Sequence, residues 1–143
     1  MESLQLNNFP SITYDKLRYG DTDRQGHINN ANFSSFLETG RVHFLYDPAA
    51  PVLPEQASFV IASLRLNFRL ELTWPGQVDI GTGILKIGNS SMVIYQKLFQ
   101  HGKEVADAET VVVQVDDRTG KSLRIGEEAR QLLTKFELHV DPQ

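Results

Sequence analysis

Residues 33 to 45 place their apolar and small side chains at helical spacing. The positions i, i+3, i+4, i+7, i+11 and i+12 are occupied by Phe33, Phe36, Leu37, Gly40, Phe44 and Leu45. This pattern predicts a helix with one buried face, and Asp47-Pro48 predicts that the helix ends near Tyr46. Such a helix is stable only if another layer of structure covers its apolar face.

The residues after position 58 predict that layer as a set of β-strands. Apolar and polar side chains alternate between Phe59 and Leu72, which predicts a strand with one continuous apolar face on the even-numbered residues. Its length predicts a bend or β-bulge within it. Further strands, separated by turn residues, are predicted at 11–19, 78–87, 92–99 and 104–115.

A short second helix is predicted from about Glu127, because apolar residues recur at helical spacing up to Phe136. The predicted order is one strand, a long helix, four strands joined by short turns, and a short helix. Strands separated in this way from the helices predict the α+β class with an antiparallel sheet. A chain of 143 residues is expected to form a single domain over 1–143.

Composition excludes several classes of protein. Cysteine is absent, which removes disulfides, thiol nucleophiles and cysteine-ligated metals. The net charge is −4 without a dense Lys/Arg cluster, so no nucleic-acid partner is expected. No apolar run is long enough to span a membrane, and residues 1–15 lack the features of an export signal. We therefore expect a cytoplasmic protein that is not associated with a membrane.

Residues 19–30, here called the polar loop, hold the side chains best suited to chemistry. The loop contains Asp21, Asp23, His27, Asn29 and Asn30 and leads directly into the predicted helix. The first turn of a helix offers unpaired N–H groups and a partial positive charge. A carboxylate facing that turn could attack or deprotonate a substrate whose developing negative charge meets the helix.

The run Asp23-Arg24-Gln25-Gly26-His27-Ile28-Asn29-Asn30, followed by Phe33, Glu38 and Arg41, resembles the signature of the 4-hydroxybenzoyl-CoA thioesterase family. The resemblance covers roughly residues 12–136. It implies the hotdog fold, in which a curved antiparallel sheet wraps a long central helix. It also implies hydrolysis of acyl-CoA thioesters by a homodimer or homotetramer whose subunits complete each other's active sites. CoA is then part of the substrate, and no separate cofactor is expected.

The resemblance also implies roles for individual residues of the polar loop. Asp23 would be the nucleophile or the general base, although an Asp here can also simply cap a turn. Gly26 would allow a positive φ or close approach of a ligand. His27 would bind substrate or orient the loop. Asn29 and Asn30 would cap the helix, and the Asn30 N–H is a candidate donor to the thioester oxygen.

Four other residues have weaker or alternative assignments. Asp21 is expected to orient the loop, because two carboxylates two residues apart do not share a dry pocket at low cost. Phe33 and Glu38 are assigned to substrate binding. Glu38 is also the second candidate for the catalytic carboxylate, but we favour a structural ion pair with Arg41 at i+3.

Other chemistries find little support. The four histidines, His27, His43, His101 and His139, have no metal-binding spacing, and no Gly-x-Ser-x-Gly elbow is present. No metal is therefore expected. Two alternatives remain open, a hydratase of the same fold and a non-catalytic acyl-CoA binding module. An acyl-CoA enzyme of this net charge also needs a local basic patch for the CoA phosphates, which the sequence does not reveal.

Overall fold

The computed structural model describes residues 3–139. Its five strands form one antiparallel sheet in the order β1-β3-β4-β5-β2. The strands are β1 (Ser11–Lys16), β2 (Ala57–Phe68), β3 (Gln77–Ile87), β4 (Ser91–Gln100) and β5 (Lys103–Asp116). The helices are α1 (Phe33–Leu45) and α2 (Glu127–Thr134), with short 3-10 turns at Leu6–Asn8, Tyr19–Asp21 and Asn30–Asn32.

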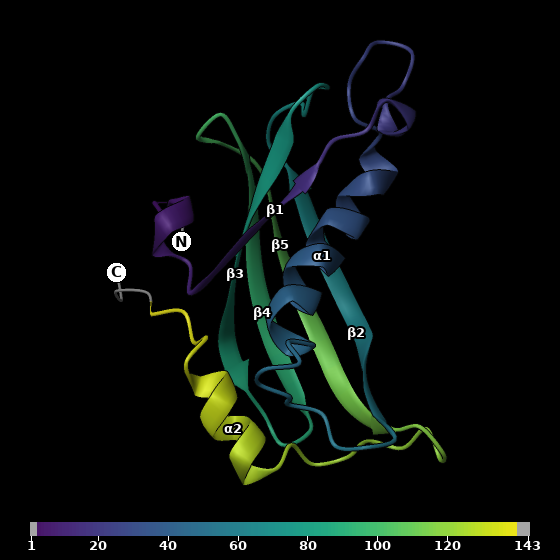
Figure 1. The fold of residues 1–143 in the computed structure, drawn as a ribbon, viewed down its shortest axis with the longest axis vertical. Helices are drawn as coiled ribbons and strands as arrows, with labels where there is room; N and C mark the ends of the chain where they lie inside the picture. The colour runs from purple at the N-terminus through teal and green to yellow at the C-terminus, as the bar shows by residue number, and fades with distance from the viewer. Residues whose placement is uncertain (1–2, 140–143) are drawn as a thin grey trace.

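The sheet curves around α1, which lies along its concave side (Figure 1). This is the hotdog fold that the family resemblance implied, and the predicted α+β order of elements is confirmed. The predicted strand at 59–72 is shorter in the structure and ends at Phe68. The backbone N–H groups of Arg69 and Leu70 both donate to the Val105 carbonyl there, as the chain turns out of the sheet.

Helix α1 packs against β1, β3 and β4 at close range. Its contact with β3 depends on Gly40. A Cβ placed on Gly40 would lie 2.6 Å from Ile80 Cγ2 and 2.7 Å from Thr82 Oγ1, so only glycine allows this approach. The buried core beneath the first half of α1 includes Phe33, Phe36, Leu37, Val78, Ile80 and Leu98. The apolar stripe predicted for the helix therefore faces the sheet.

The predicted irregularity in the long strand is a register shift between Ile61 and Ser63 of β2. It changes which residues face the helix. Ile61 pairs with Val112 of β5, and Leu64 pairs with Thr110, so these residues share one side of the sheet. The prediction of a continuous apolar face on the even-numbered residues was wrong at Val60. The register shift adds Ala62 to the strand, so before this shift the odd-numbered Ile61 faces the helix and Val60 faces the opposite side.

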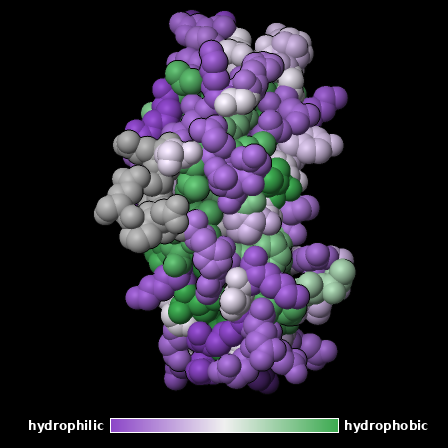
Figure 2. All heavy atoms as spheres, turned by 90° about the vertical axis from the view of Figure 1, so that its left-hand side faces the viewer, coloured by the Kyte–Doolittle hydropathy of each residue, from purple (hydrophilic) through white to green (hydrophobic). Residues whose placement is uncertain are grey.

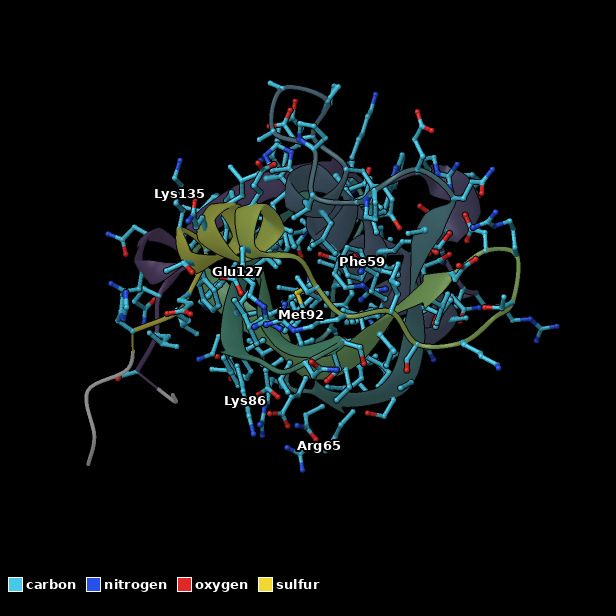
Figure 3. All side chains as sticks on the ribbon, turned by 90° about the horizontal axis from the view of Figure 1, so that it is seen from below. Phe59, Arg65, Lys86, Met92, Glu127 and Lys135 are labelled. Atoms are coloured by element: carbon cyan, nitrogen blue, oxygen red, sulfur yellow. The ribbon has the colours of Figure 1, made fainter. Side chains whose placement is uncertain are left out.

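Strand β2 is one of the two edge strands of the sheet. The closest contacts of α1 are with β1, β3 and β4, so β2 lies next to the side of the helix with fewer contacts. Ile61 and Phe68 are each 50% exposed and Leu64 is 37% exposed, although all three face the concave side. Figure 3 shows Phe59 on the helix side and Arg65 pointing away from the opposite face. The opposite flank of the molecule, with the N-terminal segment and α2, is mostly hydrophilic (Figure 2). The apolar side chains of Ile61, Leu64 and Phe68 therefore form an exposed surface on the helix side of β2.

Neither α1 nor α2 is long and apolar enough to cross a membrane, which holds for every helix among the described residues.

Candidate active site

The polar loop forms a tight hairpin between β1 and α1. Thr22 and Ile28 form a β-bridge, and Asp23 N–H donates to the His27 carbonyl at 2.8 Å. Gly26 lies at the bend with φ +80°, and a Cβ there would meet no atom within 4 Å. The positive φ, rather than a lack of space, therefore favours glycine at this position.

Asp23 holds the hairpin with one carboxylate oxygen. Its Oδ1 accepts hydrogen bonds from the backbone N–H of Gln25 at 2.8 Å and of His27 at 3.2 Å. Within residues 3–139, Oδ2 has no hydrogen bond, and the residue is exposed. The turn-capping role and a chemical role are therefore compatible, since each needs a different oxygen.

Asp21, the other carboxylate of the loop, is buried and fully engaged. It accepts hydrogen bonds from the backbone N–H of Arg18 at 3.2 Å and from its guanidinium at 3.1 and 3.3 Å. Its own carbonyl accepts from Asn29 N–H at 2.8 Å and from the Asn32 side chain at 3.0 Å. Asp21 thus orients the loop against the start of the helix, as the sequence predicted.

The helix begins with a 3-10 turn, one turn before the α-helix itself. Asn29 Oδ1 accepts from Ala31 N–H at 3.0 Å and caps this turn. The backbone N–H of Asn30 makes no hydrogen bond in the described part of the chain. It is therefore available to a ligand, as required of a donor to a thioester oxygen.

His27 connects the loop to the segment that follows β2. Its Nδ1 lies 3.3 Å from Glu71 Oε2, and its backbone forms a β-bridge with Thr73. The neighbouring Ile28 N–H donates to the Leu72 carbonyl at 2.7 Å. Glu71 was not among the site residues predicted from the sequence. Its position on the polar face of the predicted strand was the only signal, and that signal does not indicate its partner.

Two hollows lie between α1 and β2. The first, of about 380 Å³, is at the start of the helix and is lined by Asn30, Phe33, Phe68, Arg69, Leu70 and Glu71. The second, of about 330 Å³, is at the end of the helix and is lined by Glu38, Arg41, Val42, Leu45, Tyr46, Phe59, Ile61 and Val112. β2 runs opposite to α1 (Figure 1), so the two hollows lie along one line between the same two elements.

The predicted site residues divide between these places. Phe33 and Asn30 line the first hollow, and Glu38 lines the second. Asp23 lines neither hollow, although the partner of His27, Glu71, lines the first. One chain alone therefore brings the loop to the edge of the first hollow and leaves its carboxylate in solvent.

The expected ion pair between Glu38 and Arg41 does not form. Arg41 is buried, and its Nη1 donates to Gln96 Oε1 at 3.4 Å, while no oxygen of Glu38 lies within 4.0 Å of it among the described residues. Burial lowers the pKa of the Arg41 guanidinium, and the negative charge of Glu38 acts in the opposite direction. The sheet, rather than the neighbouring helical turn, holds this side chain.

Among residues 3–139, no group of three or more His, Cys, Asp or Glu side chains is arranged to hold a metal ion.

Comparison with known proteins gives three results. Residues 17–133 match the Thioesterase-like superfamily. The chain is 28% identical over 128 residues to the long-chain acyl-CoA thioesterase FadM of Escherichia coli, a match that covers 87% of this chain and 97% of FadM. Among solved structures, the PA5185 protein of Pseudomonas aeruginosa has a TM-score of 0.85 at 21% identity, covering 96% of this chain and 98% of PA5185.

A thioesterase from Thermus thermophilus, solved with coenzyme A and Zn, has a TM-score of 0.79 at 23% identity and covers 91% of this chain and 96% of its own. These two structures support the fold, and the superfamily match extends from the end of β1 to α2. The protein therefore belongs to the Thioesterase-like superfamily.

Proposed function

We propose that this protein hydrolyses acyl-CoA thioesters to a free acid and CoA. The observation that carries the proposal is the Asp23 carboxylate, which has one oxygen fixed by two backbone N–H groups and one oxygen free. The polar loop that carries Asp23 leads into a helix start whose Asn30 N–H makes no hydrogen bond within residues 3–139. Superfamily membership, the similarity to FadM and the CoA-bound Thermus relative support a thioester as the substrate.

Two routes use the same residues. In the first, Asp23 Oδ2 attacks the acyl carbon, the carbon–sulfur bond breaks, and CoA leaves as a thiolate that takes a proton from solvent. Water then opens the mixed anhydride and restores the carboxylate. In the second route, Asp23 takes a proton from a water molecule that attacks the acyl carbon directly, the carbon–sulfur bond breaks, and the CoA thiolate takes up a proton. Neither route needs a strong general acid, because a thiolate is a good leaving group.

The surrounding groups have supporting roles in either route. The Asn30 N–H would donate to the thioester oxygen as negative charge develops there. His27, held by Glu71, would fix the loop and the approach of the substrate. Phe33, in the first hollow, would contact the acyl group next to the reacting carbon. Glu38 lines the second hollow, at the other end of α1, where only the distal part of an acyl group would reach it.

We further propose that the working enzyme is a homodimer, or a homotetramer of two such dimers. The edge strand β2 has unpaired backbone groups and a half-exposed apolar face on its helix side. Pairing of two β2 edges about a two-fold axis would cover both surfaces symmetrically. It would also bring a second copy next to the two hollows between α1 and β2. The cytoplasmic location stays a prediction.

A thiol-release assay with the purified protein tests the function. We expect turnover with at least one ester in a set of short, long, branched and aromatic acyl-CoAs. Binding of these esters without release of CoA would instead identify a binding module. Hydration of an enoyl-CoA without thiol release would identify a hydratase.

Single-turnover hydrolysis in heavy-oxygen water separates the two routes. If Asp23 attacks the carbonyl and water opens the anhydride at the Asp23 carboxyl, the first product carries ordinary oxygen and Asp23 gains the label. We favour this outcome. A labelled first product with unlabelled Asp23 would contradict it and would mean that Asp23 acts as a base, or that water opens the anhydride at the acyl carbon.

A further inference from the structure

Arg41 is a buried cation with few partners. It exposes only 6% of its surface, and its one hydrogen bond within residues 3–139 is the 3.4 Å bond from Nη1 to Gln96 Oε1. That acceptor is held in turn, because Gln96 Nε2 donates to the Leu37 carbonyl at 2.9 Å and to Thr82 Oγ1 at 3.0 Å. Gln96 is thus fixed as a rigid support on one side of the guanidinium.

The remaining donors of Arg41, at Nε and Nη2, make no hydrogen bond within residues 3–139. Arg41 lines the second hollow. Fully buried polar side-chain atoms without a partner in the described residues are Thr110 Oγ1 and Gln114 Oε1, so neither Arg41 nitrogen is sealed inside the protein. A ligand in the second hollow would therefore meet a guanidinium that still has free donors, with Glu38 as the other charged residue of the lining.

The rest of the hollow is mostly apolar. Val42 and Leu45 of α1, Phe59 and Ile61 of β2 and Val112 of β5 line it. Glu38 also lines it, but this residue is exposed, so water and salt screen its charge. A mostly apolar cavity with a small number of placed polar or charged groups is the usual form of a selective small-molecule site.

We propose that the second hollow receives the far end of the acyl group and that Arg41 binds a carboxylate there. The preferred substrates would then be CoA monothioesters of dicarboxylic acids, an inference that rests on the proposed thioesterase function. A carboxylate matches the planar fork of a guanidinium with two parallel hydrogen bonds. A purely hydrocarbon chain end would instead cover Arg41 without pairing it, which is costly for a buried charge.

The position of Arg41 also sets a length requirement. Phe33, in the first hollow, and Arg41 are eight residues apart on α1, which corresponds to about 12 Å along the helix axis. A dicarboxylic acyl group must span that distance to reach the guanidinium from the thioester. Short dicarboxylic esters would therefore gain nothing from Arg41, whereas medium-length esters would.

The test compares two ester series of equal carbon number, one ending in a carboxylate and one ending in a methyl group. We expect wild-type kcat/KM to favour the medium-length dicarboxylic ester by about 10- to 100-fold, the range for a hydrogen-bonded charged group. Arg41→Met should abolish this preference, so that kcat/KM falls more for the dicarboxylic ester than for the methyl-ended ester. Arg41→Lys keeps the charge but not the fork, so it should retain part of the preference.

The matched control is Arg65→Met on the outer face of β2, where Arg65 pairs with Glu109 at 2.6 Å. It should leave the preference unchanged. Turnover of methyl-ended esters with no preference for dicarboxylic ones would overturn the inference and leave the proposed function intact. Absence of any turnover would count against the function instead. In that case, calorimetry with non-hydrolysable thioether analogues of both series tests the role of Arg41, because binding can be measured without catalysis. Equal affinities of the wild type for the two series would overturn the inference.

Discussion

Asp23 and His27 are joined by two hydrogen bonds, one between their backbones and one from the His27 backbone to the Asp23 carboxylate. Asp23 N–H donates to the His27 carbonyl at 2.8 Å, and His27 N–H donates back to Asp23 Oδ1 at 3.2 Å. The hairpin is therefore closed by the residue proposed to perform the chemistry. This arrangement restricts the carboxylate to one orientation and leaves only Oδ2 for a substrate or a water molecule.

Replacing Asp23 with Asn should lower turnover by at least ~10²-fold, the scale of a lost acid–base group. The fold should persist, because the amide oxygen can still accept both backbone hydrogen bonds. Asp47→Asn is the matched control, since exposed Asp47 caps a turn in the same way, accepting from Ala49 N–H at 2.9 Å. Near-normal steady-state turnover in folded Asp23→Asn protein would contradict the assignment.

Replacing Gly26 with Ala should destabilise the protein by about 1 kcal/mol, because φ +80° is unfavourable for a residue with a Cβ. Activity should fall as well, since the bend positions Asp23. Gly20→Ala serves as the control. Gly20 lies in the same loop without a positive φ, and a Cβ added there would meet no atom within 4 Å. Urea denaturation measures both variants, and equal stabilities would argue against backbone strain at Gly26.

Light scattering should give a mass of two or four times the 16.1 kDa chain at micromolar concentration. Leu64→Glu should shift this mass toward the monomer, because it places a charge on the uncovered helix side of β2. Val60→Glu alters the outer face of the same strand and should not. A wild-type mass near 16.1 kDa would refute the dimer.

Lys97 is completely buried in β4, with Nζ 2.5 Å from Glu104 Oε1. Glu104→Gln removes a negative charge that pairs with this buried cation and should lower the unfolding free energy by about 1 to 3 kcal/mol, less than for a fully buried pair because the Glu104 side chain is 27% exposed. Lys97→Met alone removes the buried cation itself, so no charge is left unpaired in the core, and it should lower the unfolding free energy less than Glu104→Gln does. Denaturation of both variants and of the double variant gives the coupling energy. A smaller loss for Glu104→Gln than for Lys97→Met would contradict this order.

Burial, together with the charges of Asp107 and Glu104, raises the pKa of Tyr95 to about 12. Between pH 10 and 12 the unfolded chain loses the phenolic proton while the folded protein keeps it, so the unfolding free energy falls as pH rises. This loss should be smaller in Tyr95→Phe than in the wild type. Exposed Tyr14→Phe is the control. Denaturation curves from about pH 9 to 12 measure the effect, and parallel wild-type and Tyr95→Phe profiles would contradict it.

Local patterns in the sequence were sufficient for most of the fold. The spacing from Phe33 to Leu45 predicted α1 because the face of a helix that packs on a sheet must be apolar at that period. The positive φ of Gly26 and the cap at Asn29 also followed from local backbone chemistry. The order of the strands along the chain was likewise recognisable, because each strand carries its own alternation.

The contacts that complete the site were decided only by the tertiary structure. Pairing of β2 with β5 brings Glu71 to His27, and the register shift after Ile61 determines which residues of β2 face the helix. The expected local pair of Arg41 with Glu38 gave way to Gln96, 55 positions away. A periodic pattern describes only neighbours along one element. The partner of a buried polar group depends on which strands pair and in which register, and that is set by the packing of the whole sheet around α1.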